Sequence, residues 1–272
     1  YSDPKLSLTA GKDSRGLVAS SRPVAERGNL SLFTIGDSDW DVDVHVARRI
    51  ANSHDLRWTP LPVIDSTEAD KSRWLERTGY AVGSSVKESY TTMHQLDADV
   101  EIGGLGGEIG RSNLWDDSDS IETDIDPRGL LLRFQKPEHP RLISLMEEWL
   151  EEVQEFDTYT KLDLAHHEHR LGCWAGPQHL GFRPDVDHVR PYCYRPIIEA
   201  VHRLQPDFRR NDQLPLQIIE RCWPELDDFP YNSFTDNKKY WISAVNNLKI
   251  LKIVFTDPEF TVDYLSRKYM RR

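Results

Sequence analysis

The sequence has little cysteine and no long hydrophobic run. Its three cysteines, Cys173, Cys193 and Cys222, lie far apart among 272 residues, and none of them forms a CxxC pair. They are too few and too scattered for a disulfide framework, which favours a reducing intracellular compartment. No apolar stretch approaches the ~18–20 residues of a membrane helix, and no signal-peptide pattern stands at the start. These absences predict a cytoplasmic protein that does not act at a membrane.

Basic residues are also in short supply. The chain has 34 Lys and Arg against 45 Asp and Glu, which gives a net charge of −11. Proteins that bind DNA or RNA through a broad surface need a basic face, so the balance argues against such a partner. It leaves room for a local basic pocket that holds one phosphate-bearing small molecule. With 38% hydrophobic and 29% charged residues, the chain is typical of globular proteins with one large or two modest domains.

The first hundred residues alternate between strand-like and helix-like patterns. Such alternation predicts a parallel sheet that is covered by helices on both faces. The expected strands are 5–9, 29–36, 57–63 and 98–104, and the expected helices are 14–27, 42–56, 68–80 and 83–96.

After Trp115 the character of the sequence changes. The segment "DDSDSIETDIDP" carries five Asp and one Glu with little apolar content, which predicts a mobile, solvated loop. "HPRLISLMEEWLEEVQEF" (139–156) follows as an amphipathic helix, and the remainder predicts further helices separated by prolines. We therefore expect an α/β domain over 1–115, an acidic mobile loop over 116–128 and a mainly helical region over 129–272.

A small-residue turn, "TAGKDSR", follows the first expected strand. Ligands bind at the carboxyl ends of the strands in a parallel sheet, and Thr9, Ala10 and Gly11 are small enough for backbone N–H groups to approach an anion there. Ser14 is expected to cap the next helix, whose N-terminus favours negative charge. Asp13 would repel a phosphate unless a divalent cation lay between them. The turn therefore predicts a Mg²⁺-bound phosphate group.

A second turn, "GGLGGEIGR" (103–111), follows the fourth expected strand. Four glycines in five positions again allow close backbone approach, and Glu108 adds a carboxylate that could bind a metal. Arg111 could place positive charge beside a leaving phosphate group. A glycine-rich turn alone is more often a tight connection. Two such turns at matching ends of one sheet are more specific.

Both turns resemble loops of a known superfamily. "LSLTAGKDSR" resembles the pyrophosphatase loop (PP-loop), of the form SGGxDS, of the adenine-nucleotide α-hydrolase superfamily, and "GGLGGEIGR" is similar to the GxGxDE loop of asparagine synthetase-like domains. Asp43, Ala47 and Arg48 stand where an Asp and an Ala-Arg pair recur in that family. "VRPYCYRPIIEAV" (189–201) resembles its arginine–proline–aromatic segment, which faces the active site.

The resemblance implies a five-stranded parallel sheet of the PP-loop type, a helical C-terminal region on the substrate side, and ATP bound across the strand ends. A substrate carboxylate would attack the α-phosphate, expel pyrophosphate and form an adenylate. Ammonia or an amine would then displace AMP, which makes the protein an ATP-dependent amide ligase. Backbone donors, Mg²⁺ and cations must be aimed in advance at the charge that collects on the pyrophosphate.

Site residues follow from the resemblance position by position. Asp13 and Glu108 are the implied Mg²⁺ ligands. The implied catalytic residues are Lys12, Arg111, Arg209 and Arg210, and the implied ATP-binding residues are Thr9, Ala10, Gly11, Asp13, Ser14, Phe33, Thr34, Ile35, Gly104, Gly106 and Gly107.

The sequence also departs from the family pattern. Glu108 stands where an Asp is usual, the acidic pair that normally follows is missing, and the catalytic lysine of the helical part has no clear counterpart. Lys238 and Lys239 are further positions for that lysine, besides the arginines at 209 and 210. No glutaminase domain precedes the PP-loop in this sequence, so nitrogen is expected from ammonia, an amine or a separate amidotransferase subunit. Asparagine synthesis itself is not expected.

Two other functions compete with the ligase. The first is a PP-loop enzyme that modifies tRNA or a small molecule. The acidic charge and the lack of CxxC pairs argue against it. The second is a nucleotide-binding module that has lost catalysis, which the missing lysine favours. His166, His169 and Cys173 are spaced for one helical face, where a solvated or active-site-edge face is favoured over a zinc set.

Overall fold

The computed structural model describes residues 1–36, 41–83, 91–182 and 185–232. Lys238 and Lys239 lie outside these residues. The described chain contains a five-stranded sheet in the order β3-β2-β1-β4-β5, and every neighbouring pair is parallel. This confirms the predicted α/β class and fits a PP-loop-like fold. The strands are β1 (Pro4–Ser7), β2 (Ser31–Ile35), β3 (Trp58–Leu61), β4 (Val100–Ile102) and β5 (Asp187–Val189).

Three of the first four strands lie inside the ranges that the sequence predicts, β1 begins one residue before its predicted range, and each is shorter than expected. The fifth comes from the region 129–272, which is otherwise mainly helical where it is described. It pairs with β4, with Val100 opposite Asp187 and Ile102 opposite Val189. A strand of three residues, two of them charged or polar, has too few positions to show an alternating pattern. The sheet is therefore completed by chain from the second half of the sequence.

Helices cover the sheet and fix its carboxyl edge. The first helix follows β1. Pro23, which has no N–H to continue the helical hydrogen bonds, stands at the start of a separate short helix. This explains why the single helix expected over 14–27 is two. The N-terminal helices are α1 (Lys12–Ser20), α2 (Arg22–Ala25), α3 (Val42–Ser53) and α4 (Glu68–Arg77). The helix expected over 83–96 falls partly outside the described residues.

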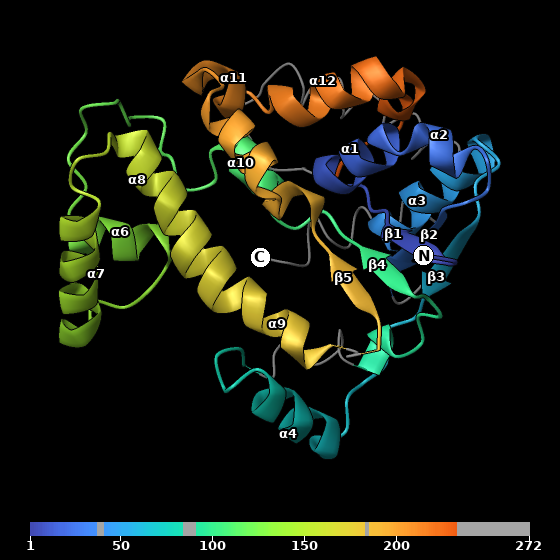
Figure 1. The fold of residues 1–272 in the computed structure, drawn as a ribbon, viewed down its shortest axis with the longest axis horizontal. Coiled ribbons are helices and arrows are strands. Elements are labelled where there is room, and N and C mark those ends of the chain that lie inside the picture. Colours follow the sequence, from blue (N-terminus) through green and yellow to red (C-terminus); the bar gives the residue numbers. More distant parts are fainter. Residues whose placement is uncertain (37–40, 84–90, 183–184, 233–272) are drawn as a thin grey trace.

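The main core lies between the sheet, α1 and α3. Leu8, Val18, Leu32 and Ile50 have no exposed surface, as the buried faces of a layered α/β domain require. Helix α12 (Gln213–Cys222) packs along α1, and its Ile219 joins the same core. In Figure 1, α12 lies directly beside α1, so a helix that begins about 200 residues later in the sequence packs with the helices of the sheet.

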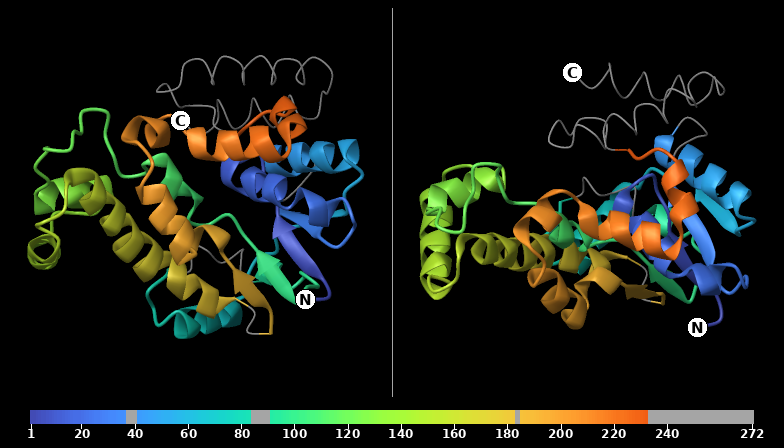
Figure 2. Two further views of the ribbon diagram at one scale, coloured as in Figure 1. Left: turned by 45° about the horizontal axis from the view of Figure 1, so that its top comes forward. Right: turned by 90° about the horizontal axis from the view of Figure 1, so that it is seen from above.

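The rest of the second half is a series of helices. In Figure 1, α8, η3 and α9 run as one diagonal rod, and α6 and α7 form a lobe at the end of that rod far from the sheet. Both views of Figure 2 show the same separation. The elements are α6 (Pro127–Arg133), α7 (Pro140–Glu152), α8 (Thr158–Ala165), the π-helical η3 (His166–Ala175), α9 (Gly176–Gly181), η4 (Pro191–Cys193), α10 (Arg195–His202), α11 (Pro206–Arg210) and η5 (Pro224–Asp228).

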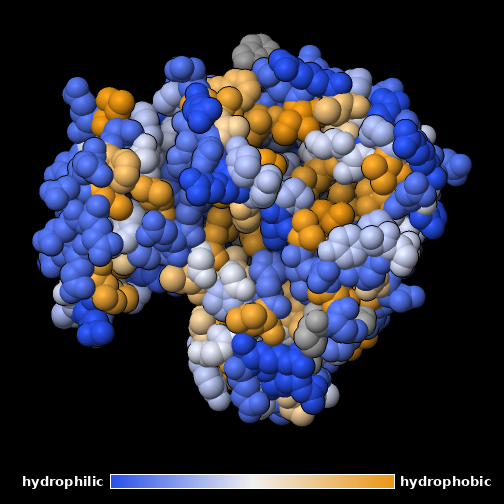
Figure 3. All heavy atoms as spheres, in the orientation of Figure 1, coloured by the Kyte–Doolittle hydropathy of each residue, from blue (hydrophilic) through white to orange (hydrophobic). Residues whose placement is uncertain are grey.

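The lobe of α6 and α7 has a core of its own. Helix α7 falls within the predicted amphipathic helix, and its Trp149 packs with Leu130 and Leu162. The outer side of this lobe is mostly hydrophilic in Figure 3. Within the described ranges, no helix is both long enough and apolar enough to cross a membrane.

The acidic segment before α6 is held by several contacts. Its Asp119 is buried and accepts two hydrogen bonds of 2.7 Å from the guanidinium of Arg133, whereas Asp117 and Ser118 are exposed. The Arg133 guanidinium also lies 3.3 Å from the carboxylate of Asp116. The charge-rich composition that predicts a solvated loop therefore includes two carboxylates, those of Asp116 and Asp119, that tie the segment to α6.

Candidate functional site

The two predicted turns meet at the carboxyl edge of the sheet. Because β2 lies on one side of β1 and β4 on the other, the strand order reverses between β1 and β4, which is where open parallel sheets bind ligands. A Cβ atom on Gly104 would lie 3.1 Å from the backbone nitrogen of Ser14, and one on Gly107 would lie 2.5 Å from Cγ of Asp13. The absence of side chains at these glycines therefore lets the second turn pack directly against the first.

Side-chain hydroxyls shape the first turn from within. The Ser14 Oγ accepts a hydrogen bond from the Thr9 N–H at 3.1 Å and lies 2.9 Å from the Thr9 Oγ1, which itself accepts the Gly11 N–H. The expectation that Ser14 caps α1 is wrong, because Gly11 occupies the N-cap position and Ser14 lies inside the first helical turn. Its hydroxyl closes the turn instead of satisfying the end of the helix.

Asp43 holds the turn from the neighbouring helix α3. Its carboxylate accepts the Ala10 N–H at 3.0 Å, and it also accepts a bond from the side chain of Asn232. The Ala10 N–H therefore already has a protein partner. The N–H groups that remain for an anion are those in the first turn of α1, because a helix provides no internal partner for them. Asp43, which stands where an Asp recurs in the resembled family, therefore positions the first turn.

Asp13 is the most constrained carboxylate of the site. One of its oxygens accepts a 2.7 Å hydrogen bond from Arg111, while Oδ1 is buried and has no hydrogen-bond partner among the described residues. Burial raises the pKa of the Asp13 carboxyl, and the charge of Arg111 opposes that rise only in part. The backbone carbonyl of Asp13 accepts a bond from the hydroxyl of Tyr192. A buried carboxylate oxygen without a partner is suited to a cation.

Glu108 lies on the second turn, in η2 (Gly107–Arg111). Its carboxylate accepts the Gly106 N–H at 3.0 Å and lies 3.5 Å from the imidazole Nε2 of His166. Burial alone would raise its pKa, but the contact with His166, a backbone hydrogen bond and the charge of Arg111 together lower it. The negative charge of Glu108 also contributes to the raised pKa of Asp13, which shows that the two carboxylates act on one another.

These two carboxylates fit a Mg²⁺ that arrives with a nucleotide. Mg²⁺ usually takes one or two protein carboxylates and fills its remaining positions with phosphate oxygens and water. Among the residues that the structure describes, no group of three or more His, Cys, Asp or Glu side chains is arranged to hold a metal. The protein alone therefore does not form a complete metal cage, and the unpartnered Oδ1 of Asp13 is its best-placed ligand atom.

Lys12 forms a buried ion pair. Its Nζ lies 2.6 Å from Oδ2 of Asp212, which stands at the junction of α11 and α12, and both side chains are more than nine-tenths buried. The Asp212 backbone is left-handed, with φ of 52°. Nothing in the sequence pattern pairs these residues, since 200 positions separate them. Asp212 belongs to "DFRRNDQLP", the segment from which the sequence predicted the two arginines.

The two predicted arginines of that segment have different environments. Arg209 is buried, forms two hydrogen bonds of 2.6 and 2.8 Å with the Asp163 carboxylate, and donates to the carbonyl of Ile109. It therefore clamps the second turn to α8. Arg210 donates to the backbone carbonyl of Asp119 and to the hydroxyl of Tyr159. Arg111 alone among the predicted arginines contacts the first turn.

Three of the predicted ATP-binding residues, Phe33, Thr34 and Ile35, lie in β2. Phe33 is 1% and Thr34 0% exposed, and the Thr34 hydroxyl donates to the carbonyl of Leu8 within the sheet. Ile35 ends the strand and is partly exposed. Of these three residues, Ile35 is the one whose position at the carboxyl edge leaves room for a ligand.

The histidines and the cysteine of η3 do not form a zinc set. Ring contacts place His169 against Trp149, whereas His166 lies beside Glu108 at the candidate site. In a π-helix the hydrogen bonds run from i to i+5, so residues spaced for one α-helical face diverge. The alternative interpretation, a helix face at the edge of the active site, describes His166.

The arginine–proline–aromatic segment does face the site. Tyr192 contacts Asp13, and Arg190 lies 2.6 Å from the buried carboxylate of Glu101 in β4. Glu101 also accepts a hydrogen bond from His188 on β5. Sequence reasoning missed Glu101 and Asp212, since each looks like an ordinary charged residue until the fold brings its partner beside it.

Comparisons with known proteins find a likeness among solved structures. No protein-family model and no curated protein sequence matches this chain. Among solved structures, the chain is similar to the U34-tRNA thiolase NcsA from Methanococcus maripaludis with its [4Fe-4S] cluster. The identity is 12%, the alignment covers 86% of this chain and 76% of the thiolase, and the TM-score is 0.25. In the present chain Cys173, Cys193 and Cys222 are free, exposed thiols.

Proposed function

We propose that the protein binds Mg²⁺–ATP at the carboxyl edge of its sheet and uses it to activate an acceptor oxygen as an adenylate, with release of pyrophosphate. The observation that carries this proposal is the contact between the two turns at the point where the strand order reverses. There, the bond from Arg111 to Asp13 joins a cation, a buried carboxylate and the N-terminus of α1. These are the groups that a polyphosphate and its metal require.

Each residue has a distinct part in this proposal. The N–H groups in the first turn of α1 face the phosphates, and Asp13 and Glu108 would hold Mg²⁺, which supplies charge neutralisation when it is bound. Arg111 is placed to stabilise the negative charge that collects on the departing pyrophosphate. Lys12 acts through its buried pair with Asp212, which fixes the start of α1. Arg209 positions the second turn and does not touch the nucleotide.

The acceptor decides which enzyme class this is. In the first candidate, an amide ligase, the acceptor is a carboxylate, and ammonia or an amine then displaces AMP. In the second, a tRNA-modifying enzyme, the adenylated oxygen belongs to a nucleobase. The net charge of −11 argues against a large RNA partner and favours the first.

Pyrophosphate release separates these functions. The protein is incubated with ATP and Mg²⁺, first with a panel of small carboxylates and amines, and then with unmodified tRNA. Pyrophosphate release with a carboxylate supports the ligase. Release with tRNA but with no carboxylate supports the tRNA-modifying enzyme. Mg²⁺-dependent ATP binding without release under any condition indicates a nucleotide-binding module without catalysis. If ATP does not bind at all, the proposal is wrong.

The variant Asp13→Ala tests the site directly. We expect it to lose Mg²⁺-dependent ATP turnover while its circular dichroism and its unfolding transition remain, because Asp13 supplies the unpartnered oxygen. Asp97→Ala is the matched control, since this aspartate is exposed and lies in the loop before β4. Unchanged turnover in Asp13→Ala would remove Asp13 from the mechanism.

A further inference from the structure

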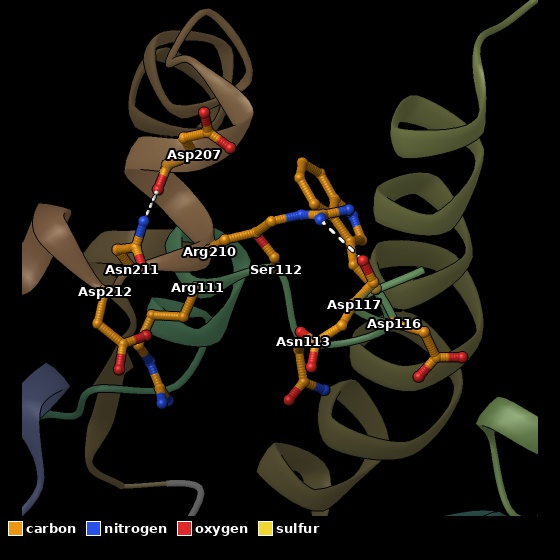
Figure 4. Close-up of a pocket in the computed structure, with 10 residues that line it drawn as sticks. Arg111, Ser112, Asn113, Asp116, Asp117, Asp207, Arg210, Asn211 and Asp212 are labelled. Atoms are coloured by element: carbon orange, nitrogen blue, oxygen red, sulfur yellow. Dashed lines mark hydrogen bonds between the residues drawn. The ribbon is translucent and has the colours of Figure 1, made fainter. Parts of the chain in front are cut away.

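A polar pocket of about 340 Å³ lies beside the second turn. Figure 4 shows its walls: Asp207, Asn211 and Asp212 at the junction of α11 and α12 on one side, and Asp116 and Asp117 on the other, with Ser112 between them. This volume lies within the range of small-molecule sites. The pocket is thus large enough for one small metabolite.

Two residues of the pocket wall also reach the first turn. Arg111 donates to the Asp13 carboxylate, and Asp212 binds the ammonium group of Lys12. Both ion pairs lie at the boundary between the pocket and the proposed phosphate site. A molecule in the pocket would therefore lie next to a bound nucleotide, as a nucleophile that attacks an adenylate must.

The pocket carries a surplus of negative charge. Four aspartates, at positions 116, 117, 207 and 212, line it together with two arginines, Arg111 and Arg210, which leaves a formal charge of −2. Both arginines are already engaged, Arg111 with Asp13 and Arg210 with the carbonyl of Asp119 and the hydroxyl of Tyr159. Two of the aspartates also have cationic partners, Asp212 in Lys12 and Asp116 in Arg133. The chemistry of the lining therefore favours a ligand that brings positive charge and hydrogen-bond donors.

Ser112 gives an independent sign of a ligand. Its side chain lines the pocket, only 8% of the residue is exposed, and its hydroxyl has no hydrogen-bond partner among the described residues. Its backbone is left-handed, with φ of 56°, a conformation that favours glycine. A buried hydroxyl without a partner at a position that glycine would fit better is costly for the fold. A bound donor would satisfy it.

We propose that this pocket binds the nucleophile of the reaction, a small hydrophilic primary amine that arrives as an ammonium ion. This inference rests on the proposed ligase function and names the class of its second substrate. An ammonium group donates three hydrogen bonds, and the Ser112 hydroxyl and the aspartates of the wall supply acceptors. Ser112 and Asp207 would then set the affinity for the amine without contacting ATP.

The chemistry balances as follows. The ammonium first gives one proton to a wall carboxylate or to solvent, which frees the nitrogen lone pair. That lone pair forms the C–N bond with the acyl carbon of the adenylate, the bond from this carbon to the AMP oxygen breaks, and AMP leaves with the electron pair. A second proton then leaves the nitrogen, so each amide formed releases two protons and one AMP.

Binding of named amines tests this site without any need for turnover. Glucosamine and putrescine are titrated into the protein by calorimetry at low ionic strength, with N-acetylglucosamine as the neutral counterpart. Glucosamine and putrescine also distinguish a hydroxylated amine from a diamine. We expect wild type to bind at least one amine and not the neutral sugar. We expect Asp207→Asn and Ser112→Gly each to weaken that binding by about tenfold or more, since each removes a bond to a charged donor.

The variants keep the test independent of folding. Ser112→Gly removes the hydroxyl and suits the left-handed backbone, so it should not destabilise the protein. Its control is Ser118→Gly, at an exposed serine outside the pocket lining, and Glu151→Gln on α7 matches the charge change of Asp207→Asn. Absence of amine binding, equal binding of the neutral sugar, or unchanged binding in both pocket variants overturns the inference. Amine binding without pyrophosphate release supports the pocket and refutes the ligase, so the two failures are distinguishable.

Discussion

Gly107→Ala is the sharpest perturbation of the contact between the two turns. The added Cβ would lie 2.5 Å from Cγ and 2.7 Å from Cβ of Asp13. Carbon atoms in contact settle about 3.5–4.0 Å apart, so the Asp13 carboxylate must move by at least about 1 Å. Gly107 is not among the described glycines with positive φ, so alanine suits its backbone. The substitution therefore displaces Asp13 without imposing backbone strain.

A shift of this size in the Asp13 carboxylate should weaken the binding of Mg²⁺. Altered support of a metal ligand typically weakens metal affinity or activity by about 10- to 100-fold, and we expect Mg²⁺-dependent ATP binding to fall by that factor. Calorimetry with ATP, with and without Mg²⁺, measures it. Gly172→Ala is the matched control, because its Cβ would meet only a carbonyl oxygen at 3.4 Å.

A double variant separates loss of the site from loss of folding. Asp13→Gly removes the atoms that an alanine at position 107 would strike, so Asp13→Gly with Gly107→Ala should unfold at the same urea concentration as Asp13→Gly alone. The double variant should still not bind Mg²⁺–ATP. Wild-type ATP affinity in Gly107→Ala would refute the view that the second turn holds Asp13 in its binding position.

Two further predictions concern stability. Asp212→Asn should lower the free energy of unfolding by about 3–5 kcal/mol, because it leaves the buried Lys12 ammonium without its partner carboxylate while asparagine tolerates the left-handed backbone. Urea unfolding measures the loss, and the double variant Lys12→Met with Asp212→Asn should recover part of it. An unchanged unfolding midpoint in Asp212→Asn would contradict the reasoning. Burial lowers the pKa values of His167 and His179 from 6.5 to about 4. Between these pH values the unfolded chain binds more protons than the folded one, so the free energy of unfolding should fall as the pH drops from about 6.5 towards 4. The double variant His167→Gln with His179→Gln should show a smaller fall, whereas an identical pH profile in that variant would assign the effect to other groups.

The sequence predicts the parts of the site that depend on local pattern. Small residues after β1 and glycines after β4 mark turns where backbone approaches a ligand, and the alternation of strands and helices places both turns at one edge. It does not reveal partners that are distant in the chain. The bond from Tyr192 to Asp13 spans 179 positions, and β5 is too short for any periodicity. The spacing of His169 and Cys173 misleads because it presumes an α-helix where the chain forms a π-helix.

The first turn contains many charged residues because several of them connect the two halves of the chain. Successive residues of a helix point in different directions, so Lys12, Asp13 and Arg15 each meet a different neighbour. Lys12 pairs with Asp212, Asp13 with Arg111, and Arg15 donates to the carbonyls of residues 226, 229 and 230. Two of these three partners come from the last described part of the chain. The turn therefore carries more charge than a phosphate needs because most of it secures the helical half to the sheet, and what remains for a ligand is one carboxylate oxygen and the N–H groups of a helix end.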